Sequence, residues 1–148
     1  MLSQLHPALV HFPLALLLCA VPAEIYGLWR KGAFWQKAAF WLLFAGTIGA
    51  FLAALSGGWA EDALQISKEI HEKVEQHETT GYILAWLYAA LLVWKFLRSK
   101  QMGRAEQAVF AGAMLAAAML LIYTGYLGGE LVYSYGAGVK GLTVPVTP

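Results

Sequence analysis

Four long apolar stretches, separated by shorter polar ones, constrain this chain more than any other feature of its sequence. They run over about 7–28, 34–55, 81–97 and 107–127. A helix needs about 20 apolar residues to cross a hydrocarbon layer of about 30 Å, and each stretch is close to that length. Since 59% of the 148 residues are hydrophobic and only 13% are charged, the composition is too apolar for a soluble domain. We therefore predict an all-α integral membrane protein in which residues 1–148 form one bundle of four transmembrane helices.

Basic residues gather in two of the three connections between these stretches. Seven of the ten lysines and arginines lie in the first and third connections or in the span ends beside them, namely Arg30, Lys31, Lys37, Lys95, Arg98, Lys100 and Arg104. Loops rich in Lys and Arg stay in the cytoplasm, so we expect both termini and the middle connection to lie outside. The simplicity of the chain suggests a bacterial or archaeal plasma membrane. A net charge of +1 leaves no basic field that would attract nucleic acid.

Two external segments flank the third and fourth stretches. In the connection 59–80, apolar residues recur at roughly helical spacing, namely Ala63, Leu64, Ile66, Ile70 and Val74. This pattern predicts an interfacial helix that runs into the third span. The tail 128–148 follows the fourth span, and Gly125, Gly128 and Gly129 either end that helix or let another surface approach it closely.

All four histidines fall on the expected outer side. His6 and His11 begin the first span, while His71 and His77 precede the third. Pro13 has no amide hydrogen, so it should bend the helix beside His11 and aim that side chain into the bundle. Histidines inside a membrane are candidates for function, whereas a histidine at the membrane surface is easily solvated.

Small residues follow two of these histidines at helical spacing. Ala15 comes four residues after His11, and Gly81 and Ala85 come four and eight residues after His77. A planar b-type haem needs neutral imidazoles from two helices and little bulk against the porphyrin. The pattern favours His11 and His77 as axial ligands. The alternative is that His11 only hydrogen-bonds across helices and His77 is solvated, and the sequence leaves both open.

The other two histidines, His6 and His71, could ligate a second haem or handle protons near the water interface. We favour the second role, and therefore one haem b rather than two, because His71 lies among glutamates in a hydrated segment. A Zn²⁺ or Cu²⁺ site built from the four histidines and Glu78 is less well supported. The spacings from His6 to His11 and from His71 to His77 put neither pair on one helix face.

Three further side chains are candidates for a site. Glu130 and Tyr133 follow the fourth span at the outer interface, where tyrosines commonly anchor a helix. They could instead meet haem propionates, a quinone head group or a docking redox partner. Glu24 lies deep in the first span near its cytoplasmic end, and it could pair with Arg30 or extend to the head groups.

Two segments carry a family resemblance, HPALVHFPLAL near the start and GYLGGELVYSYGAGV near the end. They resemble the two signatures of a widespread bacterial family of small four-helix membrane proteins of unknown function. The resemblance implies a redox setting, because relatives occur fused to Rieske iron–sulfur or cytochrome-like modules. The family's histidines then fall on His6, His11 and His77. A redox partner of this chain, membrane-bound or periplasmic, would be a separate polypeptide.

Two functions are expected on these grounds. The first is a haem-b electron-transfer subunit of a larger membrane redox assembly, passing electrons between a quinol or another haem and an external acceptor. The second is a non-catalytic structural or assembly subunit of a membrane redox complex, with no cofactor of its own, that packs against larger redox proteins. A homo- or hetero-oligomer is possible in either case. A transporter is disfavoured because no pair of Pro- or Gly-broken spans occupies corresponding positions in two halves. We expect an electron-transfer subunit rather than a free-standing enzyme.

Overall fold

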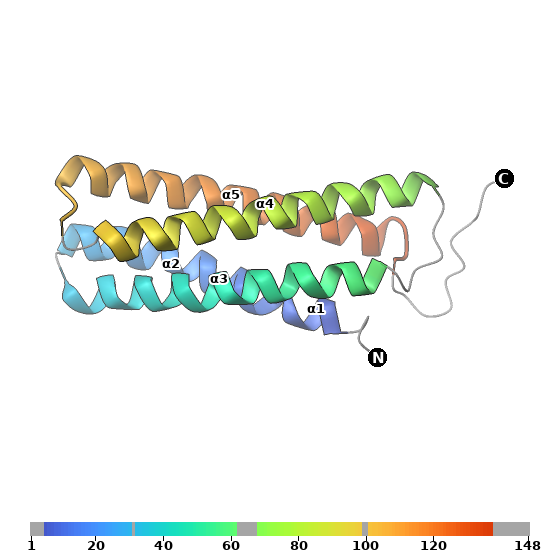
Figure 1. The fold of residues 1–148 in the computed structure, drawn as a ribbon, viewed down its shortest axis with the longest axis horizontal. Coiled ribbons are helices and arrows are strands. Elements are labelled where there is room, and N and C mark those ends of the chain that lie inside the picture. Colours follow the sequence, from blue (N-terminus) through green and yellow to red (C-terminus); the bar gives the residue numbers. More distant parts are fainter. Residues whose placement is uncertain (1–4, 31, 62–67, 99–100, 138–148) are drawn as a thin grey trace.

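Four long antiparallel helices, preceded by one short helix, make up the fold (Figure 1). The computed structural model describes residues 5–30, 32–61, 68–98 and 101–137. The helices are α1 (Leu5–Leu9), α2 (His11–Arg30), α3 (Ala33–Glu61), α4 (Lys68–Arg98) and α5 (Arg104–Tyr133). Both α2 and α4 pack against α3 and α5, so α2 and α4 face each other across the bundle diagonal.

The four long helices have the length and hydropathy of membrane spans. Candidate spans cover His6–Arg30, Ala33–Gly58, Ile70–Arg98 and Arg104–Tyr133. Their outer faces carry large exposed apolar side chains, among them Trp41, Trp86 and Ile122. The predicted all-α bundle of four membrane-spanning helices is thus confirmed, and no strand occurs in the described ranges.

The bundle has two chemically different ends. At one end, α1 and α4 begin while α3 and α5 finish, and we call it the histidine end (right in Figure 1). At the other, α2 and α4 finish while α3 and α5 begin, and we call it the basic end. The basic end was predicted to face the cytoplasm, and this orientation stays a prediction.

The two segments that we expected to lie outside the spans are largely continuous with them. Residues 68–80 are the first part of α4, so the predicted helix does run into the third span there, while 62–67, with Ala63, Leu64 and Ile66, lie outside the described residues. Ile70 and Val74 are buried against Leu131 of α5, which fixes the start of α4 on the bundle. The glycines of α5 do not end that helix, which continues to Tyr133.

Close packing of α2 on α3 depends on two glycines. A methyl group at Gly46 would lie 2.6 Å from the side chain of Leu17, and one at Gly49 would lie 3.2 Å from the ring of Pro13. Small residues let helix backbones approach in lipid, where apolar side chains gain nothing by leaving an equally apolar solvent. This contact positions the start of α2, and with it α1, against α3.

A break between α1 and α2 separates His6 from the rest of the first span. Val10 is the break, although its N–H still bonds the carbonyl of His6 at 3.1 Å and its carbonyl accepts the N–H of Leu14 at 3.3 Å. Pro13 lies in the first turn of α2, where a missing N–H costs no helical hydrogen bond. Both α1 and α2 pack on α3.

The middle of the bundle is apolar apart from one unusual hydroxyl group. Tyr88 is fully buried among residues such as Leu17, Leu84 and Phe110. Its hydroxyl finds no hydrogen-bond partner within the described part of the chain. An unpaired buried polar group costs free energy of folding because its hydrogen bond to water is lost without replacement.

We expect Tyr88→Phe to raise the free energy of unfolding by about 1 kcal/mol, since it removes that unpaired group. Chemical unfolding in a fixed detergent measures the change. Tyr82→Phe, on the partly exposed face of the same helix, is the matched control and should change little. A less stable Tyr88→Phe protein would mean that the hydroxyl makes a stabilising hydrogen bond.

A buried ion pair joins the diagonal helices near the basic end. Lys95 Nζ of α4 donates to both carboxylate oxygens of Glu24 of α2, at 2.5 and 2.7 Å. The two residues are 6% and 1% exposed, and Nζ lies 5.2 Å from the ring centroid of Phe110. Our expectation that Glu24 pairs with Arg30 or reaches the head groups is wrong, because Arg30 is exposed and lies over the ring of Trp29.

Candidate functional site: a histidine pair

Two imidazoles face each other at the histidine end of the bundle. His6 of α1 and His77 of α4 have ring centroids 6.3 Å apart, and their planes are inclined at 83°. Both side chains are half-buried. They come from elements 71 positions apart in the sequence, so the pair exists only because α1 and α4 begin at the same end.

The ring of His6 is held by α3. Its Nδ1 lies 3.0 Å from the carbonyl oxygen of Ala53 and 3.0 Å from Oγ of Ser56. The Ser56 hydroxyl donates its own hydrogen to the same carbonyl at 2.8 Å, so its oxygen is left to accept. Because a carbonyl oxygen can only accept, Nδ1 carries the proton. The neutral ring then has its lone pair on Nε2.

The ring of His77 is held in the same manner by α5. Its Nδ1 lies 3.1 Å from the carbonyl oxygen of Thr124. That carbonyl can only accept, so Nδ1 donates and Nε2 again carries the lone pair. The Thr124 side chain is itself bonded to the carbonyl of Leu120 at 2.9 Å, and the residue is buried. Both rings therefore donate from Nδ1, and in the neutral form each keeps its lone pair on Nε2.

Glycines make room for both rings. A methyl group at Gly128 of α5 would lie 3.0 Å from Cε1 of His77, which is closer than a side chain can comfortably approach. A methyl group at Gly57 of α3 would lie 3.4 Å from Cε1 of His6. Of the two roles we considered for the glycines of the last span, the close approach of another surface is the one that Gly128 has.

The predicted ligand His11 does not point into the bundle. It is exposed, and its Nδ1 bonds the carbonyl oxygen of Pro7 at 2.5 Å, within the turn that joins α1 to α2. The expectation that the proline bend aims His11 inward is therefore wrong. It is His6, one turn earlier on α1, that contacts Ala53 and Ser56 of α3. Ala15, one turn further along α2, is also exposed.

The other predicted site residues are dispersed around the pair. His71, which precedes His77 on α4, is exposed, and Glu130 is half-buried. Tyr133 is 92% exposed, so its ring does not line the site. Gly81 has open space around it, with no atom within 4 Å of a methyl group placed there. Ala85 is fully buried in the core below.

The histidine pair differs from a metal-ion site rich in carboxylates. No group of three or more His, Cys, Asp or Glu side chains that could hold a metal ion occurs in 5–30, 32–61, 68–98 and 101–137. Glu78, which follows His77, has its Oε1 3.4 Å from the position of a methyl group at Gly58. A pair of neutral imidazoles suits a group that needs two protein ligands, one from each side.

The fold and the pair together define a class, a small four-helix membrane protein with two opposed neutral imidazoles at one end. Over residues 3–141 the chain matches the family described as "Predicted membrane protein (DUF2231)", and it belongs to that family. No curated protein and no solved structure matches the chain. The membrane-protein family expected from the two terminal segments is thus confirmed, whereas fusion of relatives to Rieske or cytochrome-like modules stays a prediction.

Proposed function

We propose that this protein is an electron-transfer subunit that holds one b-type haem between His6 and His77. The main support for this proposal is that the two rings make the same kind of hydrogen bond. Each donates its Nδ1 hydrogen to a backbone carbonyl, of Ala53 or of Thr124, and each keeps its Nε2 lone pair for a metal. Histidine ligands of metals nearly always make this second hydrogen bond, which fixes the tautomer and strengthens the ligand.

The spacing of the rings supports the same assignment. An imidazole nitrogen lies about 2 Å from a divalent metal ion, and the centre of its ring lies further out. Two rings on opposite sides of one ion therefore have centroids about 6 Å apart. The observed separation is 6.3 Å. The sequence-based prediction paired His11 with His77. The pair proposed here is His6 with His77.

The residues of this chain would bind and tune the haem without making or breaking bonds in a substrate. A haem held by these two imidazoles would supply a one-electron couple at its iron, and the burial of the site and the hydrogen bonds to the ligands would set the potential of that couple. Ser56 and the two carbonyl groups hold the rings, and Gly57 and Gly128 keep their surroundings free of side chains. In this proposal a quinol or another haem donates the electron, and an external protein of Rieske or cytochrome type accepts it.

Spectra of single-histidine variants test the assignment. The detergent-purified protein is reconstituted with haem, oxidised and then reduced with dithionite, and haem content is measured as the pyridine haemochrome. We expect sharp reduced α and Soret bands that are lost in His6→Ala and in His77→Ala and kept in His11→Ala. A folded wild-type protein that takes up no haem would reject the proposal and favour the assembly subunit without a cofactor.

A further inference from the structure

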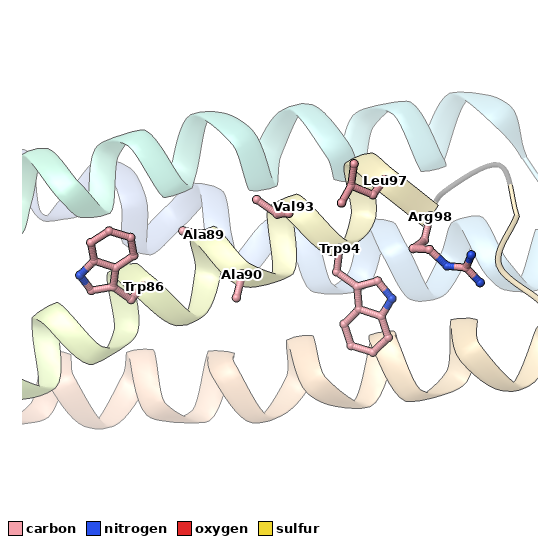
Figure 2. A pocket seen from close by; sticks show the side chains of 7 residues that line it. All are labelled: Trp86, Ala89, Ala90, Val93, Trp94, Leu97 and Arg98. Atoms are coloured by element: carbon pink, nitrogen blue, oxygen red, sulfur yellow. The ribbon is translucent and has the colours of Figure 1, made fainter.

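A groove on the outer side of α4 extends from Trp86 to Arg98, toward the basic end of the bundle (Figure 2). It has a volume of about 570 Å³ and is lined by Trp86, Ala89, Ala90, Val93, Trp94, Leu97 and Arg98. The two tryptophans stand at its sides with alanines between them, and the guanidinium group stands at its basic end (Figure 2). Trp86 is 67% and Leu97 66% exposed, so the groove opens to the surroundings of the bundle and not to its core.

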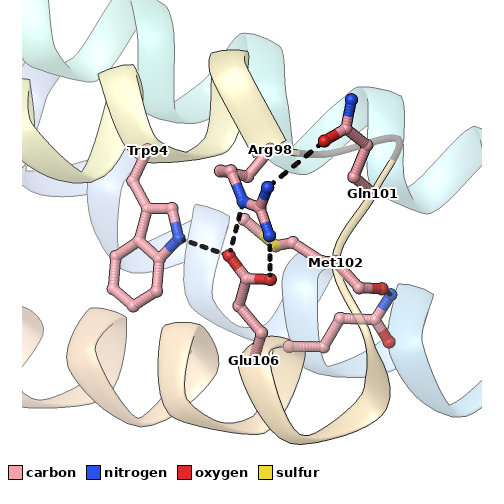
Figure 3. Close-up of polar contacts among 6 residues, drawn as sticks. Trp94, Arg98, Gln101, Met102 and Glu106 are labelled. Atoms are coloured by element: carbon pink, nitrogen blue, oxygen red, sulfur yellow. Dashed lines mark hydrogen bonds and ion pairs between the residues drawn. The ribbon is translucent and has the colours of Figure 1, made fainter.

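The polar end of the groove is held in place by Glu106 of α5 (Figure 3). Its carboxylate accepts from Trp94 Nε1 at 3.1 Å and from Arg98 through two bonds of 3.0 Å. A third donor of Arg98 bonds the side chain of Gln101 at 3.2 Å. One wall and the guanidinium are thus fixed without a ligand. Of the five N–H groups of an arginine, these bonds use three and leave two for another acceptor.

The charge at this end of the bundle is positive. Arg30, Lys37 and Arg104 are exposed there together with Arg98. Of the described carboxylates at the basic end, Glu24 is buried against Lys95 and Glu106 is paired with Arg98. The charges of these two pairs therefore compensate each other, and the exposed Arg30, Lys37 and Arg104 are left in excess. An anionic head group would be attracted to this surface.

We propose that the groove binds an anionic phospholipid, with one acyl chain between Trp86 and Trp94 and the phosphate at Arg98. An acyl chain matches a narrow apolar groove on a membrane span, and the excess positive charge at one end selects the head group. Tryptophan and arginine at the ends of a span are the side chains that meet lipid head groups in membrane proteins. The site is separate from the histidine pair and does not depend on haem.

The test compares retention of phosphatidylglycerol and phosphatidylcholine with identical acyl chains, using native mass spectrometry of the full-length protein. We expect the wild type to retain phosphatidylglycerol preferentially. Arg98→Gln should reduce this preference about fivefold, the effect of one basic residue near a membrane surface. Arg104→Gln, which removes a charge outside the groove, is the matched control and should reduce it less.

A second variant tests the acyl chain independently of charge. Ala90→Trp fills the groove and should lower retention of both lipids, whereas Ala116→Trp, on an exposed position of α5, should not. Equal retention of the two lipids by the wild type, or no effect of Ala90→Trp in a folded protein, would overturn the proposal. Displacement of the lipid by inorganic phosphate alone would also overturn it, because it would show binding of a free anion.

Discussion

Replacing Glu24 by alanine is expected to lower the free energy of unfolding by about 3–5 kcal/mol, the largest effect on stability that we predict. The change leaves the ammonium group of Lys95 buried without its carboxylate, beside the ring of Phe110. A single buried charge is costly because neither water nor lipid compensates it. Unfolding by denaturant in mixed micelles, followed by circular dichroism, measures the loss.

Two controls separate this effect from a general loss of packing. The double replacement of Glu24 by Leu and Lys95 by Met removes both charges and should recover most of the stability, since apolar residues of similar volume replace buried ion pairs well. Glu106→Ala breaks the exposed pair with Arg98 and should cost less than about 1 kcal/mol. If Glu24→Ala costs no more than Glu106→Ala, the pair is not buried in the folded protein.

Gly128→Val is expected to weaken haem binding by about 10–100-fold, the range seen when groups that support a metal ligand are lost. The first carbon of the new side chain would lie 3.0 Å from Cε1 of His77, so the ring has to move away from the carbonyl of Thr124. Valine is no worse in a helix than glycine, so α5 itself should not be destabilised. Titration of the haem-free protein with haem measures the affinity.

Gly125→Val is the matched control for this prediction. Gly125 lies three residues earlier on the same helix, and no atom lies within 4 Å of a methyl group placed there. The variant should therefore bind haem as the wild type does. An equal loss in both variants would point to a general effect on α5, and no loss in either would place the haem away from His77.

The spans and the gathering of histidines at one end could be predicted from the sequence because both depend on local composition and on alternating helix direction. His77 was expected to lie at this end because it precedes an apolar stretch, and the structure places its ring against that of His6, whereas its role as a haem ligand stays a prediction. His11 was expected to face the bundle because Pro13 follows it, but the sequence does not show which side of the helix packs on α3. That side is set by the packing of α1 and α2 against α3.

The groups that hold the site could not be predicted from residue types. The acceptors for the two imidazoles are backbone carbonyls of Ala53 and Thr124, and every residue has such a carbonyl. The partner of Glu24 was also missed, because Arg30 is close in the sequence whereas Lys95 is 71 residues away. Only the diagonal arrangement of α2 and α4 brings those two side chains together.

Electron paramagnetic resonance of the ferric, haem-loaded protein tests the central claim most directly. Two neutral imidazoles on one haem iron give a low-spin ferric signal, and ring planes inclined at 83° should make that signal strongly anisotropic. We predict this signal for the wild type and for His11→Ala. A high-spin signal in the wild type, or a low-spin signal that survives in His6→Ala, would contradict the assignment of His6 and His77 as the axial pair.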